Sequence, residues 1–139
     1  MLIVRPAQPS DLDAVFSLAS AFATSFTVER SAFESSFAGL LQSLDAFLSV
    51  ASDDGRVVGY LLGFDHYTFY ANGRVAWVEE IMVVEEMRRR GVGRQLMESC
   101  EQWATRRQSK LIAVATRRAA PFYRGLGYDE SATYFRRLL

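Results

Sequence analysis

The feature that most constrains the fold is a turn rich in arginine and glycine, placed between a predicted strand and an amphipathic helix. The apolar run over residues 75–84 is typical of a strand, and residues 88–94 read Arg-Arg-Arg-Gly-Val-Gly-Arg. Apolar side chains then recur at helical spacing over residues 96–104. Backbone amides at the start of a helix face outward and carry the positive end of its dipole. This order of elements therefore predicts an anion-binding site.

Two details of this turn support a bound anion. Gly91 and Gly93 lack the Cβ atoms that would hold an anion away from the backbone. Four arginines crowd the positive end of the helix dipole, where they are unfavourable without an anion. Two common phosphate motifs do not fit: the Gly-Lys-Ser/Thr ending of a P-loop is missing, and Leu96 replaces the third glycine of the dinucleotide fingerprint.

The rest of the chain reads as one domain, residues 1–139, without internal repeats or linkers. Turn sequences at residues 53–56 and 71–74 predict antiparallel hairpins. Periodicity predicts strands over residues 2–5, 45–52, 57–69 and 75–84, and helices over 11–23 and about 33–44.

Composition excludes several classes of function. The formal net charge is +0, which disfavours a nucleic-acid binder. The first apolar run, residues 2–4, is too short for a secretory signal or a membrane span. Cys100 is the only cysteine and His66 the only histidine, so we expect no disulfide and no metal site. We expect a cytoplasmic protein without a membrane partner.

A second motif follows the helix. Residues 111–116 predict a buried strand, so that strand, helix and strand form a βαβ-like crossover. A short helix starting near residue 118 or 119 then carries Phe122 and Tyr123 and closes at Leu126-Gly127-Tyr128, where Gly127 suits a left-handed cap. Tyr134 and Phe135 predict a final strand.

The two motifs together resemble the GNAT superfamily of N-acetyltransferases over residues 75–135. Arg88, Gly91 and Gly93 match the family signature Arg-x-x-Gly-x-Gly, and the second motif matches its Phe-Tyr and Leu-Gly-Tyr landmark. The resemblance implies an α+β fold: a mostly antiparallel central sheet, splayed between two central strands, with helices on both faces. It implies transfer of acetyl from acetyl-CoA to a primary amine, of a small molecule or a peptide, by direct attack in a ternary complex.

The resemblance also implies roles for residues. Tyr123 is the expected general acid facing the CoA sulfur. The backbone of Ile81 to Val83 is expected to pair with pantetheine, and the arginine turn to hold the pyrophosphate. Thr116 or Arg117 stands where the family often has an asparagine that contacts the cofactor. The expected cofactor-binding residues are Ile81, Met82, Val83, Arg88, Arg89, Arg90, Gly91, Val92, Gly93, Arg94 and Thr116.

Adjacent carboxylates in the strand are candidates for the catalytic base. Strict alternation would place Glu79 and Glu80 on opposite faces, with one of them lining the cleft. That carboxylate either accepts the ammonium proton or holds a cationic acceptor, and ordinary structural roles remain open for both. Several acidic residues mildly favour a cationic acceptor: Asp53, Asp54, Asp65 and the Glu79/Glu80 pair.

Two alternatives stay open from the sequence. The chain could bind acyl-CoA as a silent sensor or interaction domain, although Tyr123 and a strand carboxylate argue against this. The tail around Tyr134–Arg137 could serve a homodimer contact instead of completing the sheet.

Overall fold

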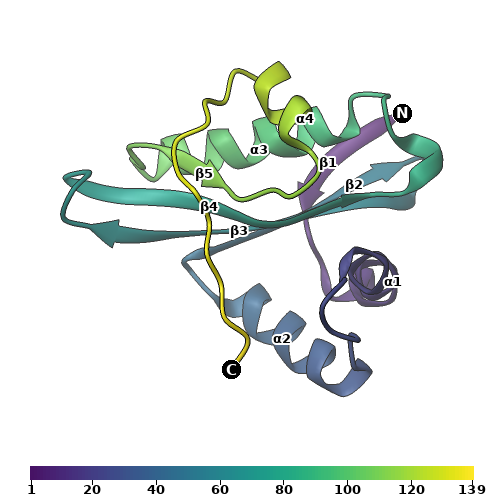
Figure 1. Cartoon of the computed structure of the whole chain (residues 1–139). Coiled ribbons are helices and arrows are strands. Elements are labelled where there is room, and N and C mark those ends of the chain that lie inside the picture. Colours follow the sequence, from purple (N-terminus) through teal and green to yellow (C-terminus); the bar gives the residue numbers. More distant parts are fainter.

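A five-stranded sheet in the order β1-β2-β3-β4-β5 runs through the molecule, with helices on both faces, in the computed structural model of residues 1–139 (Figure 1). Strands β1 to β4 are antiparallel neighbours, and β5 pairs parallel to β4. This confirms the α+β class and the crossover. The strands are β1 (Leu2–Pro6), β2 (Ala46–Asp53), β3 (Arg56–Thr68), β4 (Gly73–Val83) and β5 (Ile112–Val114). The helices are η1 (Pro9–Asp11), α1 (Leu12–Phe22), α2 (Arg30–Gln42), η2 (Glu85–Met87), α3 (Val92–Arg106) and α4 (Ala120–Gly125).

Each face of the sheet has its own hydrophobic core. On one face, Leu96 and Cys100 of α3 belong to a buried cluster with Leu61 and Val78 of the sheet. On the other face, α1 and α2 cover a second cluster that includes Tyr60. Burial raises the pKa of the Cys100 thiol to about 12, which leaves it a neutral core residue. None of the helices is long and apolar enough to cross a membrane.

Strand β4 has a partner along only part of its outer edge. Ala76 to Val78 pair with β5, and residues 79–83 have no strand on that side. On the inner side the register with β3 shifts from Leu62–Glu80 to Gly63–Val78, which leaves Glu79 as the extra residue of a β-bulge. Because a bulge bends its strand and increases the local twist, it explains why β4 diverges from β5 at this point.

The end of the chain differs from the prediction. The final strand expected around Tyr134 and Phe135 is wrong, because residues 129–139 contain no regular element. The left-handed turn after α4 is confirmed, with φ 91 at Gly127. The tail then crosses the β5 edge of the sheet, from the α3 side to the α2 side (Figure 1). Although β5 is an edge strand, the tail makes no backbone ladder with it.

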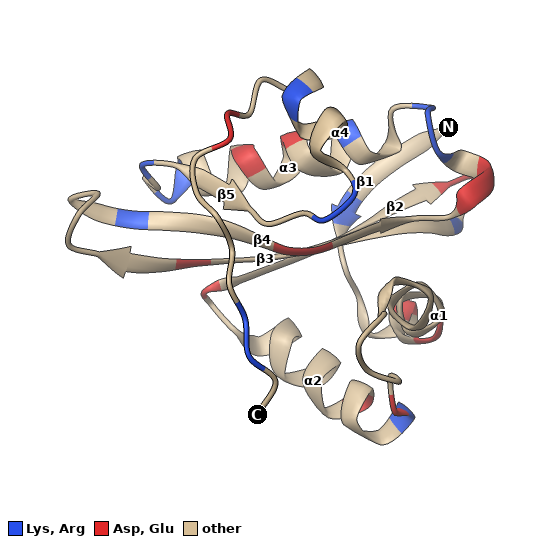
Figure 2. Ribbon diagram, in the orientation of Figure 1, with Lys and Arg blue, Asp and Glu red and all other residues tan.

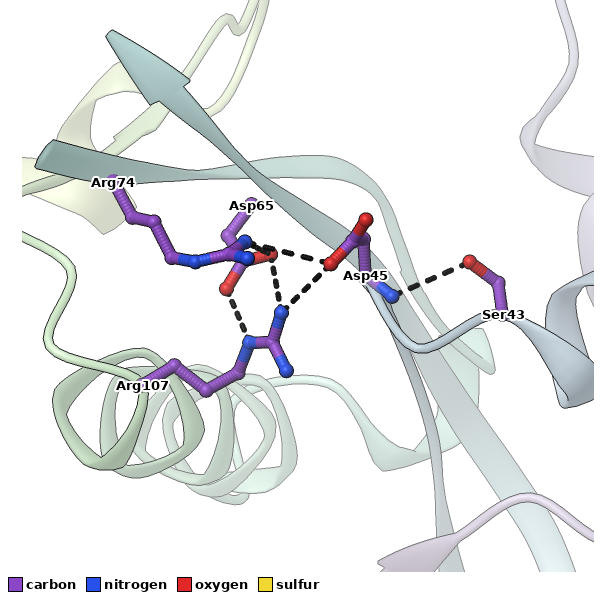
Figure 3. Close-up of polar contacts among 5 residues, drawn as sticks. All are labelled: Ser43, Asp45, Asp65, Arg74 and Arg107. Carbon is purple, nitrogen blue, oxygen red and sulfur yellow. Dashed lines mark hydrogen bonds and ion pairs between the residues drawn. The ribbon is translucent and has the colours of Figure 1, made fainter.

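A network of charged side chains ties the end of α3 to the sheet (Figure 3). The Asp65 side chain is fully buried and accepts hydrogen bonds from Arg74 Nη1 at 2.8 Å and Arg107 Nη2 at 2.9 Å. Arg107 Nη2 also donates to Asp45 Oδ1 at 2.8 Å. Asp65 is therefore not free to attract a cationic acceptor, since both of its oxygens are already paired within the fold.

Candidate active site

The arginine turn presents a run of free backbone donors. The chain passes through Arg89 with φ 64 and Gly91 with φ 82, and Gly91 is the N-cap of α3. The first amide of the helix with a partner is that of Gln95, which donates to the Gly91 carbonyl at 3.0 Å. The amides of residues 89–94 have no acceptor within the chain. Together with the helix dipole, they form a donor surface suited to a phosphate group.

The arginine side chains around this turn are not neutralised. Arg88, Arg89, Arg90 and Arg94 are exposed, and none of them takes part in an ion pair. Figure 2 shows the basic segment where the chain enters α3. Arg88 differs from the others because its Nε donates to the Val83 carbonyl at 3.1 Å. Arg88 thus holds the end of β4 against the turn.

The two signature glycines serve different purposes. Gly91 adopts a left-handed conformation, and a Cβ there would meet nothing within 4 Å. A Cβ at Gly93 would lie 3.1 Å from Phe122 Cζ, a tight contact that the Phe122 ring would have to relieve by shifting slightly. The interpretation that both glycines clear space for the anion is therefore incomplete. Gly91 permits the backbone turn, and Gly93 permits α4 to pack against the start of α3.

Tyr123 is anchored by its ring. Only 7% of the residue is exposed, and it belongs to the same buried cluster as Val78 and Val92. Its ring contacts that of Phe122 edge to face at 5.0 Å between centroids, and that of Tyr128 at 5.9 Å. The hydroxyl has no hydrogen-bond partner in the chain and is not fully buried. Burial raises the pKa of Tyr123, so the phenol keeps its proton at neutral pH.

A β-bulge breaks the strict alternation from which the placement of the two glutamates was predicted. Val78 and Ile81 pack on the same core although they stand three residues apart, so alternation does not hold across the bulge. Glu79, the extra residue of the bulge, is exposed. Glu80 is half-buried and accepts a hydrogen bond from Tyr60 Oη at 2.7 Å.

Tyr60 contacts Glu80, a candidate site residue, and sequence reasoning missed this contact. Tyr60 is only 1% exposed. Burial is the largest cause of the raised pKa of its phenol, and the adjacent Glu80 carboxylate raises the pKa further. The phenol therefore stays protonated and donates to Glu80. A tyrosine in an apolar strand gives no sign of this contact in the sequence. The register of β3 with β4 pairs Tyr60 with Met82, and this pairing places Tyr60 diagonally opposite Glu80.

The remaining predicted site residues lie at the end of β4 and between β5 and α4. Ile81 and Val83 pack toward the α3 core, and Met82 packs toward the α1 and α2 core. Thr116 Oγ1 accepts a hydrogen bond from the Ala119 amide at 3.0 Å, so Thr116 shapes the entry to α4. The structure contains no group of three or more His, Cys, Asp or Glu residues placed to hold a metal ion.

The chain is similar to known proteins both in sequence family and in fold. The acetyltransferase (GNAT) family model matches residues 12–128. A search of curated proteins finds no match to the sequence. Three solved structures share the fold at low identity. They are a transcriptional regulator from Bacillus halodurans C-125 (21% identity, TM-score 0.90, covering 100% of both chains), glucosamine-6-phosphate N-acetyltransferase from Arabidopsis thaliana (14%, TM-score 0.88, 99% and 98%) and an aminoglycoside N-acetyltransferase in complex with CoA (20%, TM-score 0.85, 99% and 95%).

Proposed function

The chain belongs to the acetyltransferase (GNAT) family, and from this membership we propose that it transfers acetyl from acetyl-CoA to a primary amine by direct attack in a ternary complex. The observation that carries the proposal is the run of free amides at residues 89–94, next to the unpaired edge of β4. One structural neighbour acetylates glucosamine-6-phosphate and another an aminoglycoside, by their names. Both are amines of small molecules, which supports an amine acceptor here.

The chain offers two kinds of contact to CoA. The free amides and the unpaired side chains of Arg89 and Arg94 fit a pyrophosphate, because backbone donors and guanidinium groups both favour phosphate oxygens. The edge of β4 at residues 81–83 has no strand beside it, and only its Val83 carbonyl is occupied, by Arg88 Nε, so it fits an amide-containing chain that pairs like a strand. Acetyl-CoA supplies the activated thioester carbonyl; binding and orientation come from these residues.

We assign the role of proton donor to Tyr123. A leaving thiolate needs a proton, and the Tyr123 phenol is protonated at neutral pH and reaches solvent from a buried ring. Its ring is held by Phe122 and Tyr128, so the hydroxyl occupies a defined position. The packing of Phe122 on Gly93 further couples this donor to the anion turn.

We assign the role of base, or of an anchor for a cationic acceptor, to Glu80 in preference to Glu79. Glu80 is oriented by Tyr60 and partly shielded from water, whereas Glu79 is exposed. An oriented, partly desolvated carboxylate accepts a proton from an ammonium group more effectively than a freely rotating one. The acceptor itself is a small-molecule amine or a peptide amine.

A second candidate is a CoA-binding domain without turnover, favoured by the likeness to a protein described as a transcriptional regulator. A thiol-release assay separates the two. The protein is incubated with acetyl-CoA and a panel of amines (an aminoglycoside, an amino sugar phosphate, a polyamine and a lysine peptide) while free CoA thiol is followed. Release that requires one of the amines supports the enzyme. Tight CoA binding with no release for any amine would support the sensor.

A further inference from the structure

The hairpin that joins β3 to β4 carries three strongly exposed aromatic side chains, which we call the aromatic tip. Tyr67 is 75% exposed, Phe69 101% and Tyr70 73%. Residues 67–73 read Tyr-Thr-Phe-Tyr-Ala-Asn-Gly, so none of them is charged. The hairpin extends beyond the helices on both faces of the sheet (Figure 1). A group of exposed apolar side chains on a protruding turn marks an interaction surface.

Hydrogen bonds within the turn hold these side chains outward. Thr68 Oγ1 donates to the Gly73 carbonyl at 2.8 Å and accepts from the Ala71 amide at 3.3 Å. The Asn72 amide donates to the Phe69 carbonyl at 3.2 Å, and Asn72 takes a left-handed conformation with φ 60. Folding the turn back onto the sheet would break these bonds, so the rings stay presented to the surroundings.

A lysine without an ion pair lies against this turn. Lys110 Cε is 3.5 Å from the position that a Cβ at Gly73 would take, and the Lys110 amide donates to the Arg74 carbonyl at 2.8 Å. Lys110 takes part in no ion pair. The carboxylate of the same hairpin, Asp65, is already paired with Arg74 and Arg107. The tip is therefore flanked by a free positive charge, while the negative charge of its own hairpin is neutralised.

The aromatic tip and the arginine turn lie at opposite ends of α3 (Figure 1). The arginine turn leads into Val92 at the start of the helix, and Arg107, just after its end, bonds to Asp65 in the hairpin. A helix of 15 residues is about 22 Å long. A flat surface that contacts the tip therefore leaves the proposed CoA site open to solvent.

The size and shape of the tip favour a lipid bilayer over a protein partner. Three aromatic side chains supply about 450–750 Å² of surface for burial. A stable protein interface needs about 800 Å² from each partner. A bilayer needs no complementary shape, and a tyrosine places its ring and its hydroxyl where hydrocarbon meets the headgroups. Anionic headgroups also attract a free lysine such as Lys110.

We propose that the aromatic tip docks the protein on an anionic lipid bilayer. Phe69 enters the boundary of the acyl chains, Tyr67 and Tyr70 lie at the level of the headgroups, and Lys110 faces their negative charge. The short apolar runs of the sequence argue only against a spanning segment, so a contact at the surface replaces the expectation of no membrane partner. The proposal is independent of acetyl transfer, because none of these residues belongs to the proposed CoA site.

The first test measures binding of the full chain to vesicles by co-sedimentation. The vesicles contain phosphatidylcholine alone or with about 30% phosphatidylserine. We expect binding to the anionic vesicles, and binding at least about tenfold weaker in Phe69→Asp/Tyr70→Asp, because burial of the rings drives insertion. Lys110→Ala should lose about fivefold on the anionic vesicles and less on the neutral ones.

Leu44→Asp is the matched control for the tip variant. Leu44 is 86% exposed and lies outside the hairpin, so the control should bind as the wild type does. A wild-type chain that binds neither kind of vesicle, or binding that the tip variant leaves intact, would overturn the proposal. Light scattering provides a further outcome: a dimer that only the tip variant dissociates, without vesicle binding, would assign the tip to a second copy and also overturn it.

The second test locates the tip in the bilayer. Phe69→Trp adds an indole to those of Trp77 and Trp103, whose fluorescence is measured in the wild type and subtracted. Lipids brominated on the acyl chains quench an indole that enters them. We expect quenching of the added indole on anionic vesicles, and none for Leu44→Trp. An indole at position 69 that stays unquenched on vesicle-bound protein would contradict insertion of the tip.

Discussion

The ring of Phe122 lies against the Cα of Gly93, so closely that a Cβ at position 93 would stand 3.1 Å from Phe122 Cζ. This contact joins the two motifs of the family. The anion turn at the start of α3 and the helix that carries Tyr123 are therefore one packed unit. A change on either side of the contact should be felt at both the proposed phosphate site and the proposed proton donor, Tyr123.

Gly93→Ala should weaken CoA binding and stability together. The added methyl group pushes against the Phe122 ring, and overpacking of this kind costs about 1–3 kcal/mol. Phe122→Leu in the same chain should restore part of the loss, which calorimetric titration with CoA and thermal denaturation can measure. Gly91→Ala is the contrast: it strains a left-handed residue in open space, so Phe122→Leu should not rescue it.

Substituting Arg89 and Arg94 with alanine should reduce CoA affinity about tenfold or more, because each charge-assisted hydrogen bond to phosphate contributes about 1.5–3 kcal/mol. The loss should shrink as salt is raised, since salt screens the same interaction in the wild type. Arg106→Ala is the control, an exposed arginine at the other end of α3 without an ion pair. Equal effects of the double substitution and the control would contradict a phosphate role.

Tyr123→Phe should lower turnover about 10²- to 10⁴-fold while CoA affinity stays nearly unchanged, because a general acid acts on the transition state. The raised pKa of Tyr123 sets the sign of its pH dependence: the protonated form is lost only above the ordinary tyrosine pKa of about 10. Activity should therefore not fall through loss of this proton between pH 7 and 9. Tyr134→Phe, in the exposed tail, should leave turnover as in the wild type.

Glu80→Gln should lower kcat more than Glu79→Gln, because only Glu80 is oriented by a buried donor. Tyr60→Phe removes that donor, and the loss of one hydrogen bond to a charged group is worth about 1.5–3 kcal/mol. We expect a roughly tenfold lower kcat for Tyr60→Phe, with the KM for acetyl-CoA unchanged. A pH–rate profile that keeps its acidic limb in Glu80→Gln would exclude Glu80 as the base.

Asp65→Asn should destabilise the fold without touching CoA binding. The substitution leaves Arg74 and Arg107 without their buried counter-charge. These arginines are 21% and 26% exposed, so water offsets part of the loss, and we expect about 2 kcal/mol less free energy of unfolding in urea. Asp45→Asn, at a 62% exposed carboxylate, should cost less than about 1 kcal/mol. If the two substitutions lowered the free energy of unfolding equally, burial of Asp65 would not be the source of its larger contribution to stability.

Local patterns in the sequence determined most of the secondary structure and both motifs. The strands and helices follow from apolar periodicity of two or 3.6 residues, and the hairpins from turn residues such as Asn72-Gly73. The free amides of the arginine turn also follow locally, because any helix start leaves its first amides without partners. These features need only neighbouring residues, so the chain alone reveals them.

Tertiary structure alone decided the contacts that orient the site. The bulge at Glu79 depends on the register of β3 with β4, and that register places the Tyr60 hydroxyl on Glu80. The packing of Phe122 on Gly93 depends on where α4 meets α3. The predicted final strand was wrong for the same reason: a strand needs to pair with a partner edge, and no local pattern states whether the chain makes that pairing. Register and packing join residues distant in sequence, so only the folded chain specifies them.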